Sequence, residues 1–233
     1  MISIKNIFSD AMHLFYPHNC IGCGSDLLSK QELLCIKCLY KLPHTHFEKF
    51  EGNPVEKIFT GRFHLKAGHS EFYFAKNQLI QELIHQLKYK DNKEIGFYLG
   101  AMMGKNILQS ARFSDIDYII PLPLYADKEF KRGYNQAEII CSGMSSVMNV
   151  SVLTKNVIRQ KFTETQTRKH RTERWENVEE SFAVKNPGAL NGKNILLIDD
   201  VITTGATLEA CAQTMLKIPG INISLATLAI ASK

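Results

Sequence analysis

The chain has 233 residues, an apolar content of 45% and a net charge of +5 at pH 7. This length accommodates one α/β core with a small appendage and excludes two large domains. No repeat or low-complexity tract stands out, so we expect a soluble globular protein. Polar and charged residues interrupt the apolar positions of residues 1–16, which excludes a signal-peptide core and a membrane span of roughly 20 apolar residues. We therefore expect a cytoplasmic protein with an amphipathic N-terminal helix.

Four of the six cysteines form two short pairs, Cys20 with Cys23 and Cys35 with Cys38, and eleven residues separate the pairs. Two Cys-x-x-Cys turns at this separation direct four thiolates at one tetrahedral ion, and a reducing cytosol favours zinc over a disulfide framework. A closed four-thiolate site has no open coordination position, so we expect this Zn²⁺ to be structural. Three nearby histidines are alternative ligands: His18, His44 and His46. A site with four thiolates does not need them.

A polar stretch at residues 43–54, with a Gly-Asn-Pro turn, separates the cysteine segment from the rest of the chain. Such a stretch is typical of a domain boundary. We therefore predict an N-terminal helix and four-cysteine module over residues 1–50 and a larger domain over residues 51–233.

Strand patterns alternate with helix patterns in this larger domain. Short apolar or aromatic runs predict strands near residues 58–59, 62–65, 72–74, 118–124, 153–157, 182–184, 195–198 and 223–230. Apolar residues at helical spacing predict helices over residues 79–87 and from residues 95, 137 and 208. This alternation indicates βαβ units, so the predicted fold is α/β, with a mainly parallel sheet flanked by helices.

The most informative stretch, residues 194–211, joins a buried strand to a helix through a polar turn. Asp199 and Asp200 follow the apolar run, where we expect the strand to end. Small and hydroxyl-bearing residues then lead into the helix: Thr203, Thr204, Gly205, Ala206 and Thr207. A helix N-terminus at the carboxyl end of a strand offers free N–H groups to a phosphate. The acids would repel a bare phosphate but accept hydrogen bonds from vicinal hydroxyls, which favours a sugar phosphate over a nucleoside triphosphate.

Basic residues gather at three further positions. Lys88 lies in a basic and aromatic loop after the helix at residues 79–87, and Arg132 lies in a Gly-containing loop, residues 125–136. The window of residues 155–174, which includes Arg171, holds seven basic residues and two acidic ones. This window is a loop that closes over a polyanionic ligand, a nucleic-acid surface, or a solvated helix face.

Residues 198–207, Ile-Asp-Asp-Val-Ile-Thr-Thr-Gly-Ala-Thr, resemble the phosphoribosyl-pyrophosphate-binding motif of type I phosphoribosyltransferases. The competing interpretation is an ordinary strand, turn and helix with solvated acids. The resemblance extends over almost the whole chain to the ComF family of competence-associated proteins. The motifs that carry it are the two cysteine pairs, Leu-Lys-Tyr at 87–89, Pro-Leu-Pro at 121–123, Arg-Gly-Tyr-Asn-Gln-Ala-Glu at 132–138 and Thr-Gln-Thr at 165–167.

The resemblance implies a type I phosphoribosyltransferase-like domain that binds phosphoribosyl pyrophosphate with Mg²⁺. The residues that it assigns to this ligand are Asp199, Asp200, Val201, Thr203, Thr204, Gly205, Ala206 and Thr207. The loop at residues 125–133 would bind pyrophosphate, and a basic loop at residues 162–180 would close over the site. Lys88, Arg132 and Arg171 are the predicted catalytic cations, because negative charge grows on the departing pyrophosphate.

Two classes of function are compatible with these residues. The first is a phosphoribosyltransferase with an unidentified acceptor, connected with DNA uptake and natural transformation. The second is a non-catalytic competence protein that binds single-stranded DNA and DNA-uptake proteins and uses the phosphoribosyl site to sense a ligand. Zinc knuckles and basic segments with aromatic residues suit single strands, whose bases stack on rings.

Overall fold

A parallel sheet forms the centre of the protein. The computed structural model describes residues 19–26, 28, 32–75, 78–160 and 181–231. Its strands are β1 (Ala67–Phe74), β2 (Tyr118–Pro121), β3 (Ser151–Val152), β6 (Asn194–Ile202) and β7 (Asn222–Ala231). They lie in the order β1-β7-β6-β2-β3, with every neighbouring pair parallel. A separate antiparallel pair joins β4 (Val157–Arg159) to β5 (Phe182–Val184). The predicted α/β fold with a mainly parallel sheet is confirmed.

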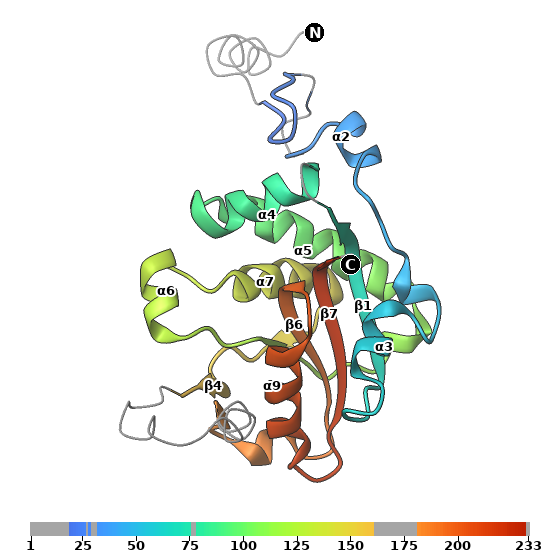
Figure 1. Cartoon of the computed structure of the whole chain (residues 1–233), viewed down its shortest axis with the longest axis vertical. Coiled ribbons are helices and arrows are strands. Elements are labelled where there is room, and N and C mark those ends of the chain that lie inside the picture. The colour runs from blue at the N-terminus through green and yellow to red at the C-terminus, as the bar shows by residue number, and fades with distance from the viewer. Residues whose placement is uncertain (1–18, 27, 29–31, 76–77, 161–180, 232–233) are drawn as a thin grey trace, which may run out of the picture.

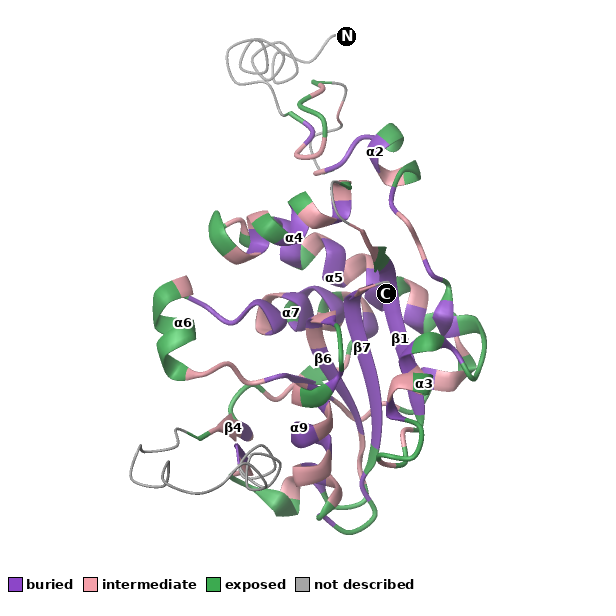
Figure 2. Cartoon of the chain, in the orientation of Figure 1, coloured by how far each residue is buried: buried purple, intermediate pink, exposed green. Residues whose placement is uncertain are grey.

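Helices cover both faces of this sheet (Figure 1). The α-helices of the described chain are α2 (Ile36–Tyr40), α3 (Pro54–Phe59), α4 (Leu79–Tyr89), α5 (Lys93–Leu108), α6 (Ala126–Arg132), α7 (Gln136–Met148) and α9 (Ala206–Leu216). Single-turn helices lie at η1 (Phe47–Lys49), η2 (Ala111–Phe113) and η5 (Pro187–Leu190). One buried cluster contains the apolar faces of α4, α5 and α7, and a second contains those of α3 and α9. Figure 2 shows the resulting burial of β1, β6 and β7.

The central strand β6 is longer than the sequence pattern predicts. Its apolar run, Ile195, Leu196, Leu197 and Ile198, is fully buried because helices cover both faces of the sheet. Pairing with β7 then continues past the two acids to Ile202. Asp199 and Asp200 therefore lie within the strand, and the expectation that the strand ends before them is wrong.

Two strand predictions near the start of the larger domain are also wrong. The residues predicted as a strand near 58–59 form the end of α3, and residues 62–65 form no regular strand. Asn53 caps α3, because its side chain accepts hydrogen bonds from the N–H groups of Val55 and Glu56, and Pro54 occupies the first helical turn. Both features are standard helix-start signals. They place the buried Phe59 against the second core cluster.

α6 occupies the segment predicted as a loop after β2. None of its seven residues is buried, and Phe130 is 90% exposed. The helix stands at the side of the molecule, well apart from the helices that cover the sheet (Figures 1 and 2). It ends at Gly133, whose φ of 79° is a left-handed conformation that glycine adopts at helix ends.

The cysteine segment lies beyond α4 and α5 at one end of the molecule (Figure 1). Cys20, Leu34, Cys35 and Cys38 belong to the same buried cluster as the apolar face of α4. A division at residue 50 stays a prediction. Within the described ranges, no helix has the length and apolar character needed to cross a bilayer.

Candidate functional site

The two acids of β6 have different surroundings. Asp200 is 8% exposed, and its Oδ2 lies 2.9 Å from Nζ of Lys88 at the end of α4. The backbone N–H of Asp200 donates a hydrogen bond of 2.8 Å to Oδ1 of Asp199. The structure therefore places Lys88, one of the predicted catalytic cations, beside the acid pair.

Asp199 holds its proton more tightly than an ordinary carboxyl group. Burial, followed by the adjacent charge of Asp200, raises the pKa of Asp199 to about 7. The hydrogen bond from the backbone of Asp200 and the positive charges of Lys88 and Arg159 oppose this rise. The acid pair thus carries less negative charge than two free carboxylates, which reduces its repulsion of a phosphorylated ligand.

The turn after β6 forms a small hollow at the start of α9. A cavity of about 50 Å³ is lined by Asp199 and Val201, by the turn residues Ile202 to Gly205, and by the first residues of α9 up to Leu208. The first N–H groups of an α-helix have no partner within the helix. At the start of α9, the N–H of Ala206 donates a long hydrogen bond of 3.5 Å to Oγ1 of Thr204, and the next N–H groups are available to an anion. The hollow therefore contains every residue assigned to phosphoribosyl pyrophosphate except Asp200, which lies beside it in the strand.

Gly205 is essential to the shape of this turn. Its φ is 76°, and a Cβ atom there would lie 2.8 Å from atoms of Ile58 and Phe59. The turn is thus packed directly against α3. From the sequence, a steric requirement for glycine is expected at the ligand, whereas the structure places one at the protein core as well.

Two arginines near the site are not among the predicted catalytic cations, although Arg159 belongs to the basic window at residues 155–174. Arg62 donates hydrogen bonds to the carbonyl of Thr204 at 3.2 Å and to Oε2 of Glu209 at 2.9 Å. The guanidinium of Arg159 lies 3.8 Å from the ring centroid of Tyr125, and its buried Nε has no hydrogen-bond partner among the described residues. Neither residue lies in a recognisable motif, so only the fold brings them to β6 and α9.

Of the other two predicted catalytic cations, the structure describes Arg132 and does not describe Arg171. Arg132 donates a 2.6 Å hydrogen bond to Gln136 and lies 5.6 Å from the ring centroid of Tyr89, the residue after Lys88. It therefore lies near the end of α4, at the α6–α7 connection. Arg171 and the closing loop predicted at residues 162–180 lie outside the described residues. Of the basic window at residues 155–174, the structure describes residues 155–160.

The four predicted metal ligands converge on one point. The sulfur atoms of Cys20, Cys23, Cys35 and Cys38 all lie within 4.8 Å of one another. Those of Cys23 and Cys35 are 3.7 Å apart, close to the roughly 3.8 Å edge of a tetrahedron with Zn–S bonds of about 2.3 Å. All six cysteines are free thiols. The cluster is compatible with structural zinc.

The backbone around Cys20 favours its thiolate, which is the form that binds metal. Burial opposes ionisation, but N–H groups of Cys35, Cys23 and Gly22 lower the pKa of Cys20 to about 6. The N–H of Cys35 lies 3.2 Å from the Cys20 sulfur. These N–H groups would also donate to the Cys20 sulfur when it binds a metal ion.

Comparison with known proteins places this architecture among its relatives. Residues 126–232 match the family model of the phosphoribosyl transferase domain. DNA utilization protein YhgH of Shigella flexneri is 30% identical over 59% of this chain and 61% of its own length. Competence protein F of Haemophilus influenzae is 29% identical over 58% of this chain and 61% of its own, and competence protein ComFC of Bacillus subtilis is 30% identical over 62% and 56%.

The chain thus spans about three-fifths of the length of the curated relatives it matches. Among solved structures, the glutamine phosphoribosylpyrophosphate amidotransferase of B. subtilis aligns with 60% of this chain and 30% of its own, at 12% identity and a TM-score of 0.42. The family match, the relatives and the four-cysteine cluster agree with the resemblance found in the sequence: the chain is similar to ComF-type competence proteins, and residues 126–232 match the phosphoribosyl transferase domain.

Proposed function

We propose that the chain binds phosphoribosyl pyrophosphate with Mg²⁺ in the cytoplasm, at the carboxyl end of β6, and transfers the phosphoribosyl group to an acceptor in a process connected with DNA uptake. The observation that carries this proposal is the junction of β6 and α9. There, a hollow bearing free helix N–H groups adjoins two carboxylates in one strand, one of which is paired to Lys88. A phosphate and a pair of sugar hydroxyls fit these two halves.

Each half of the junction has a separate role in binding. The turn from Thr203 to Gly205 and the first turn of α9 would hold the 5-phosphate. Asp199 and Asp200 would accept hydrogen bonds from the ribose hydroxyls, with Lys88 fixing the carboxylate of Asp200. Arg132, together with Arg171, would face the pyrophosphate. Bound Mg²⁺ would neutralise charge on the pyrophosphate oxygens.

The chemistry requires positioning and charge stabilisation. The bond from C1 of ribose to pyrophosphate breaks, its electron pair leaves with the pyrophosphate, and a lone pair of the acceptor forms the new bond to C1 while the acceptor loses a proton. The cations stabilise the charge that grows on the leaving group, and the carboxylates lie near the ribose as C1 becomes cationic. The acceptor supplies the nucleophile, so the protein needs none of its own.

Release of pyrophosphate tests this activity. The protein is mixed with phosphoribosyl pyrophosphate, Mg²⁺ and, in turn, nitrogen bases, amines and single-stranded oligonucleotides. We expect release above the rate of spontaneous hydrolysis with one acceptor class, and loss of that release in Asp200→Asn. Asp117→Asn is the matched control, because Asp117 pairs with Lys193 next to the amino-terminal end of β6. Release that is equal in all three proteins would contradict a catalytic role for the acid pair.

A second candidate is a competence protein that binds single-stranded DNA without catalysis. Its support is an aromatic and basic surface near the site: Phe130 is 90% exposed and Tyr89 is 64% exposed, with Lys128, Lys131 and Arg132 on α6. Exposed rings among cations suit unpaired bases. If the protein binds oligonucleotides and phosphoribosyl pyrophosphate but releases no pyrophosphate with any acceptor, this candidate replaces the first.

We further propose that Cys20, Cys23, Cys35 and Cys38 hold one structural Zn²⁺. The four sulfurs leave no coordination position for a substrate, so the ion would stabilise the module at residues 1–50 and take no part in transfer. The phosphoribosyltransferase-like domain would then comprise residues 51–233.

A further inference from the structure

We infer that the four-cysteine module positions Lys88 in the phosphoribosyl site, with α4 as the rigid connection. One end of α4 contacts the module, and the other end supplies the lysine that pairs with Asp200. The affinity of the site for its ligand would then depend on the integrity of a module that touches no part of the ligand. The identity of that ligand rests on the proposed function, but the mechanical connection does not.

The contact at the first end of α4 is close. A Cβ atom on Gly22 would lie 2.9 Å from the Leu79 side chain and 2.9 Å from the sulfur of Cys38. Leu79 is the first residue of α4, so the helix begins directly against the backbone of the first knuckle. A methyl group on Gly22 would force the Leu79 side chain or the Cys38 sulfur to shift, so Leu79 lies in direct contact with the knuckle.

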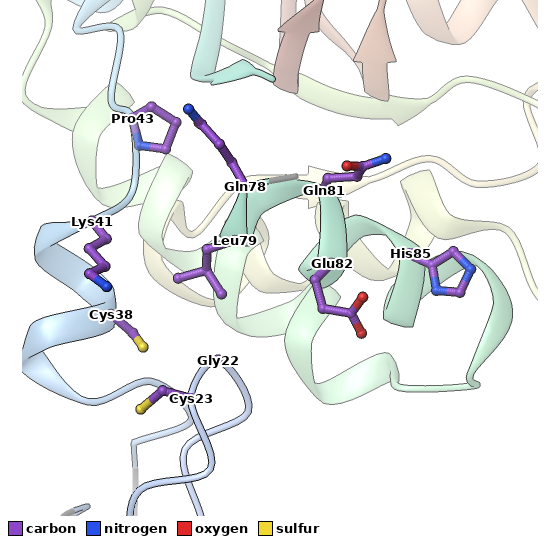
Figure 3. Close-up of a pocket in the computed structure, with 10 residues that line it drawn as sticks. All are labelled: Gly22, Cys23, Cys38, Lys41, Pro43, Gln78, Leu79, Gln81, Glu82 and His85. Atoms are coloured by element: carbon purple, nitrogen blue, oxygen red, sulfur yellow. The ribbon is translucent and has the colours of Figure 1, made fainter. Parts of the chain in front are cut away.

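Part of this interface is open, whereas Leu34 of the module is fully buried in the same core cluster as α4. A pocket of about 880 Å³ separates parts of the module from α4, with Gly22, Cys23 and Lys41 on one side and Glu82 and His85 on the other (Figure 3). Figure 3 shows Leu79 directed from α4 toward Cys38 and Gly22, whereas Glu82 and His85 lie further along the pocket. Leu79 therefore contacts the module at the edge of this opening, and changes of this side chain should alter the contact.

The body of α4 can transmit a displacement. Ile80, Leu83, Ile84 and Leu87 are at most 3% exposed and form its inner face. Gly96 of α5 leaves room for Leu87, because a Cβ atom at Gly96 would lie 2.6 Å from the Leu87 side chain. An α-helix of this length spans roughly 16 Å and moves as a unit when one face is packed. A tilt at Leu79 therefore reaches the last turn.

The last turn fixes Lys88. The carbonyl of Leu87 accepts a hydrogen bond from the hydroxyl of Tyr134, and the next residue places its Nζ 2.9 Å from Asp200. A displacement of about 1 Å takes such a contact beyond hydrogen-bonding range. Asp200 would then lose the partner that orients its carboxylate, and Asp199 receives its own hydrogen bond from the backbone of Asp200. That backbone group belongs to β6 and does not depend on Lys88, so the module would control the Asp200 carboxylate through Lys88.

Leu79→Ala tests the inference in the full-length, zinc-loaded protein. We expect the dissociation constant for phosphoribosyl pyrophosphate, measured by calorimetry with Mg²⁺, to rise roughly fivefold or more, as for a typical coupling between sites. The control is Ile116→Ala, which shortens a partly buried side chain of the same core cluster two residues before β2 begins. This variant should leave the affinity unchanged.

A double-mutant cycle with Lys88→Ala separates positioning from general destabilisation. Lys88→Ala alone should weaken binding, and adding Leu79→Ala should then have no further effect, because the residue being positioned is gone. In a Lys88→Arg background, which retains the cation, Leu79→Ala should again weaken binding. Equal losses in the wild-type and Lys88→Ala backgrounds would overturn the inference.

Hydrogen exchange tests the positioning of α4 in the protein without ligand. Leu79→Ala, or removal of zinc with a chelator, should speed amide exchange in the last turn of α4, at residues 85–90, and leave β2 unchanged. Unchanged exchange at residues 85–90 would also overturn the inference. If the wild-type protein binds no phosphoribosyl pyrophosphate, the proposed function fails, whereas this measurement still decides whether the module positions α4.

Discussion

The four-cysteine module and the junction of β6 with α9 both use turns to present polar groups. The two regions differ in how much core packing stabilises them. The module includes α2, on which Ile36 is 85% exposed and Tyr40 is 93% exposed, so much of its apolar surface remains in water. At the junction, the residues before the acids are fully buried under helices on both faces of the sheet. The module therefore depends on its ion, whereas the junction is preformed by the core.

This difference predicts which perturbations stay local. A segment with little core obtains its folding energy from the metal, and the apparent binding energy of a structural zinc is about 10–16 kcal/mol. A turn carried by a buried sheet keeps its shape without a ligand, because the packing that fixes it is already present. Loss of metal should disorder the first region, and loss of ligand should leave the second intact.

The largest expected effect follows from removing one sulfur. Cys35→Ser should abolish binding of the single zinc and unfold the module while the sheet remains folded. Cys141→Ala is the matched control, since Cys141 is buried in α7 and does not belong to the group of four cysteines. Metal analysis should find no zinc in Cys35→Ser and one zinc per chain in Cys141→Ala. Circular dichroism should show that both variants retain most of the helix and strand signal. A zinc-free wild-type protein would contradict the prediction.

A substitution at Gly205 tests whether the junction is fixed by the core. Gly205→Ala should lower the free energy of unfolding by about 1–3 kcal/mol more than Gly61→Ala. Both glycines have a left-handed φ, 76° and 78°, but a Cβ atom at Gly61 meets nothing within 4 Å. The difference therefore isolates the contact with Phe59. Chemical denaturation that shows the same destabilisation in both variants would mean that the turn is not set by α3.

The larger Gly205→Val change, expected from the sequence to weaken only ligand binding, should also cost stability. The same 2.8 Å contact with Ile58 and Phe59 is the reason, because a branched side chain cannot avoid it. Thermal unfolding of this variant should show a lower Tm than that of Gly205→Ala.

The pKa of Asp199 predicts a dependence on pH at the junction. Ribose hydroxyls donate to the ionised carboxylate, so affinity for phosphoribosyl pyrophosphate should rise about tenfold between pH 6 and pH 8 for a group with a pKa of about 7. Stability changes in the opposite direction. The folded-state pKa lies above the ordinary value of 3.8, so the contribution of Asp199 to stability is full below about pH 4 and is lost as the pH rises through 7.

Asp199→Asn should remove both trends. Its calorimetric affinity should vary little between pH 6 and pH 8, and the difference in unfolding free energy between wild type and variant should change between pH 4 and pH 8. Equal pH slopes for the two proteins would show that another group titrates.

The smallest expected effect concerns the basic window at residues 155–174. Replacing Arg168, Lys169 and Arg171 with Ala should diminish a weak, salt-sensitive binding of single-stranded DNA. The slope of log affinity against log salt should become shallower by about 0.7 for each DNA phosphate that the variant no longer neutralises. Salt titrations that superimpose for the variant and the wild type would show that this segment does not bind DNA and would favour the phosphoribosyltransferase function.

The sequence predicts those parts of the fold in which one strong signal dominates. The apolar runs of β6 and β7, the helical spacing of α4 and the cysteine pairs can each be identified from neighbouring residues. The strand prediction for Ile58 and Phe59 is wrong because two apolar residues fit either a strand or a helix. The stronger signal is Asn53 followed by Pro54, which is a helix start and also resembles the turn of a domain boundary.

The rest of the candidate site depends on contacts between distant segments. A basic and aromatic loop indicates Lys88, but the partner of this lysine, Asp200, is set by the packing of α4 on the sheet. Arg62 reaches Thr204 across more than half of the chain, and no local pattern indicates such a contact. Spacing alone therefore predicts the residue types of the site and cannot predict which cation meets which acid.

The most direct test of the account is a calorimetric titration of the wild-type protein with phosphoribosyl pyrophosphate, with and without Mg²⁺, alongside Asp200→Asn and the control Asp117→Asn. We predict saturable binding with one ligand per chain that Mg²⁺ strengthens. Asp200→Asn should weaken it at least tenfold, about 1.4 kcal/mol, and Asp117→Asn should leave it unchanged. Absence of binding to the wild type, or an equal affinity in Asp200→Asn, would contradict the assignment of the ligand site to the end of β6.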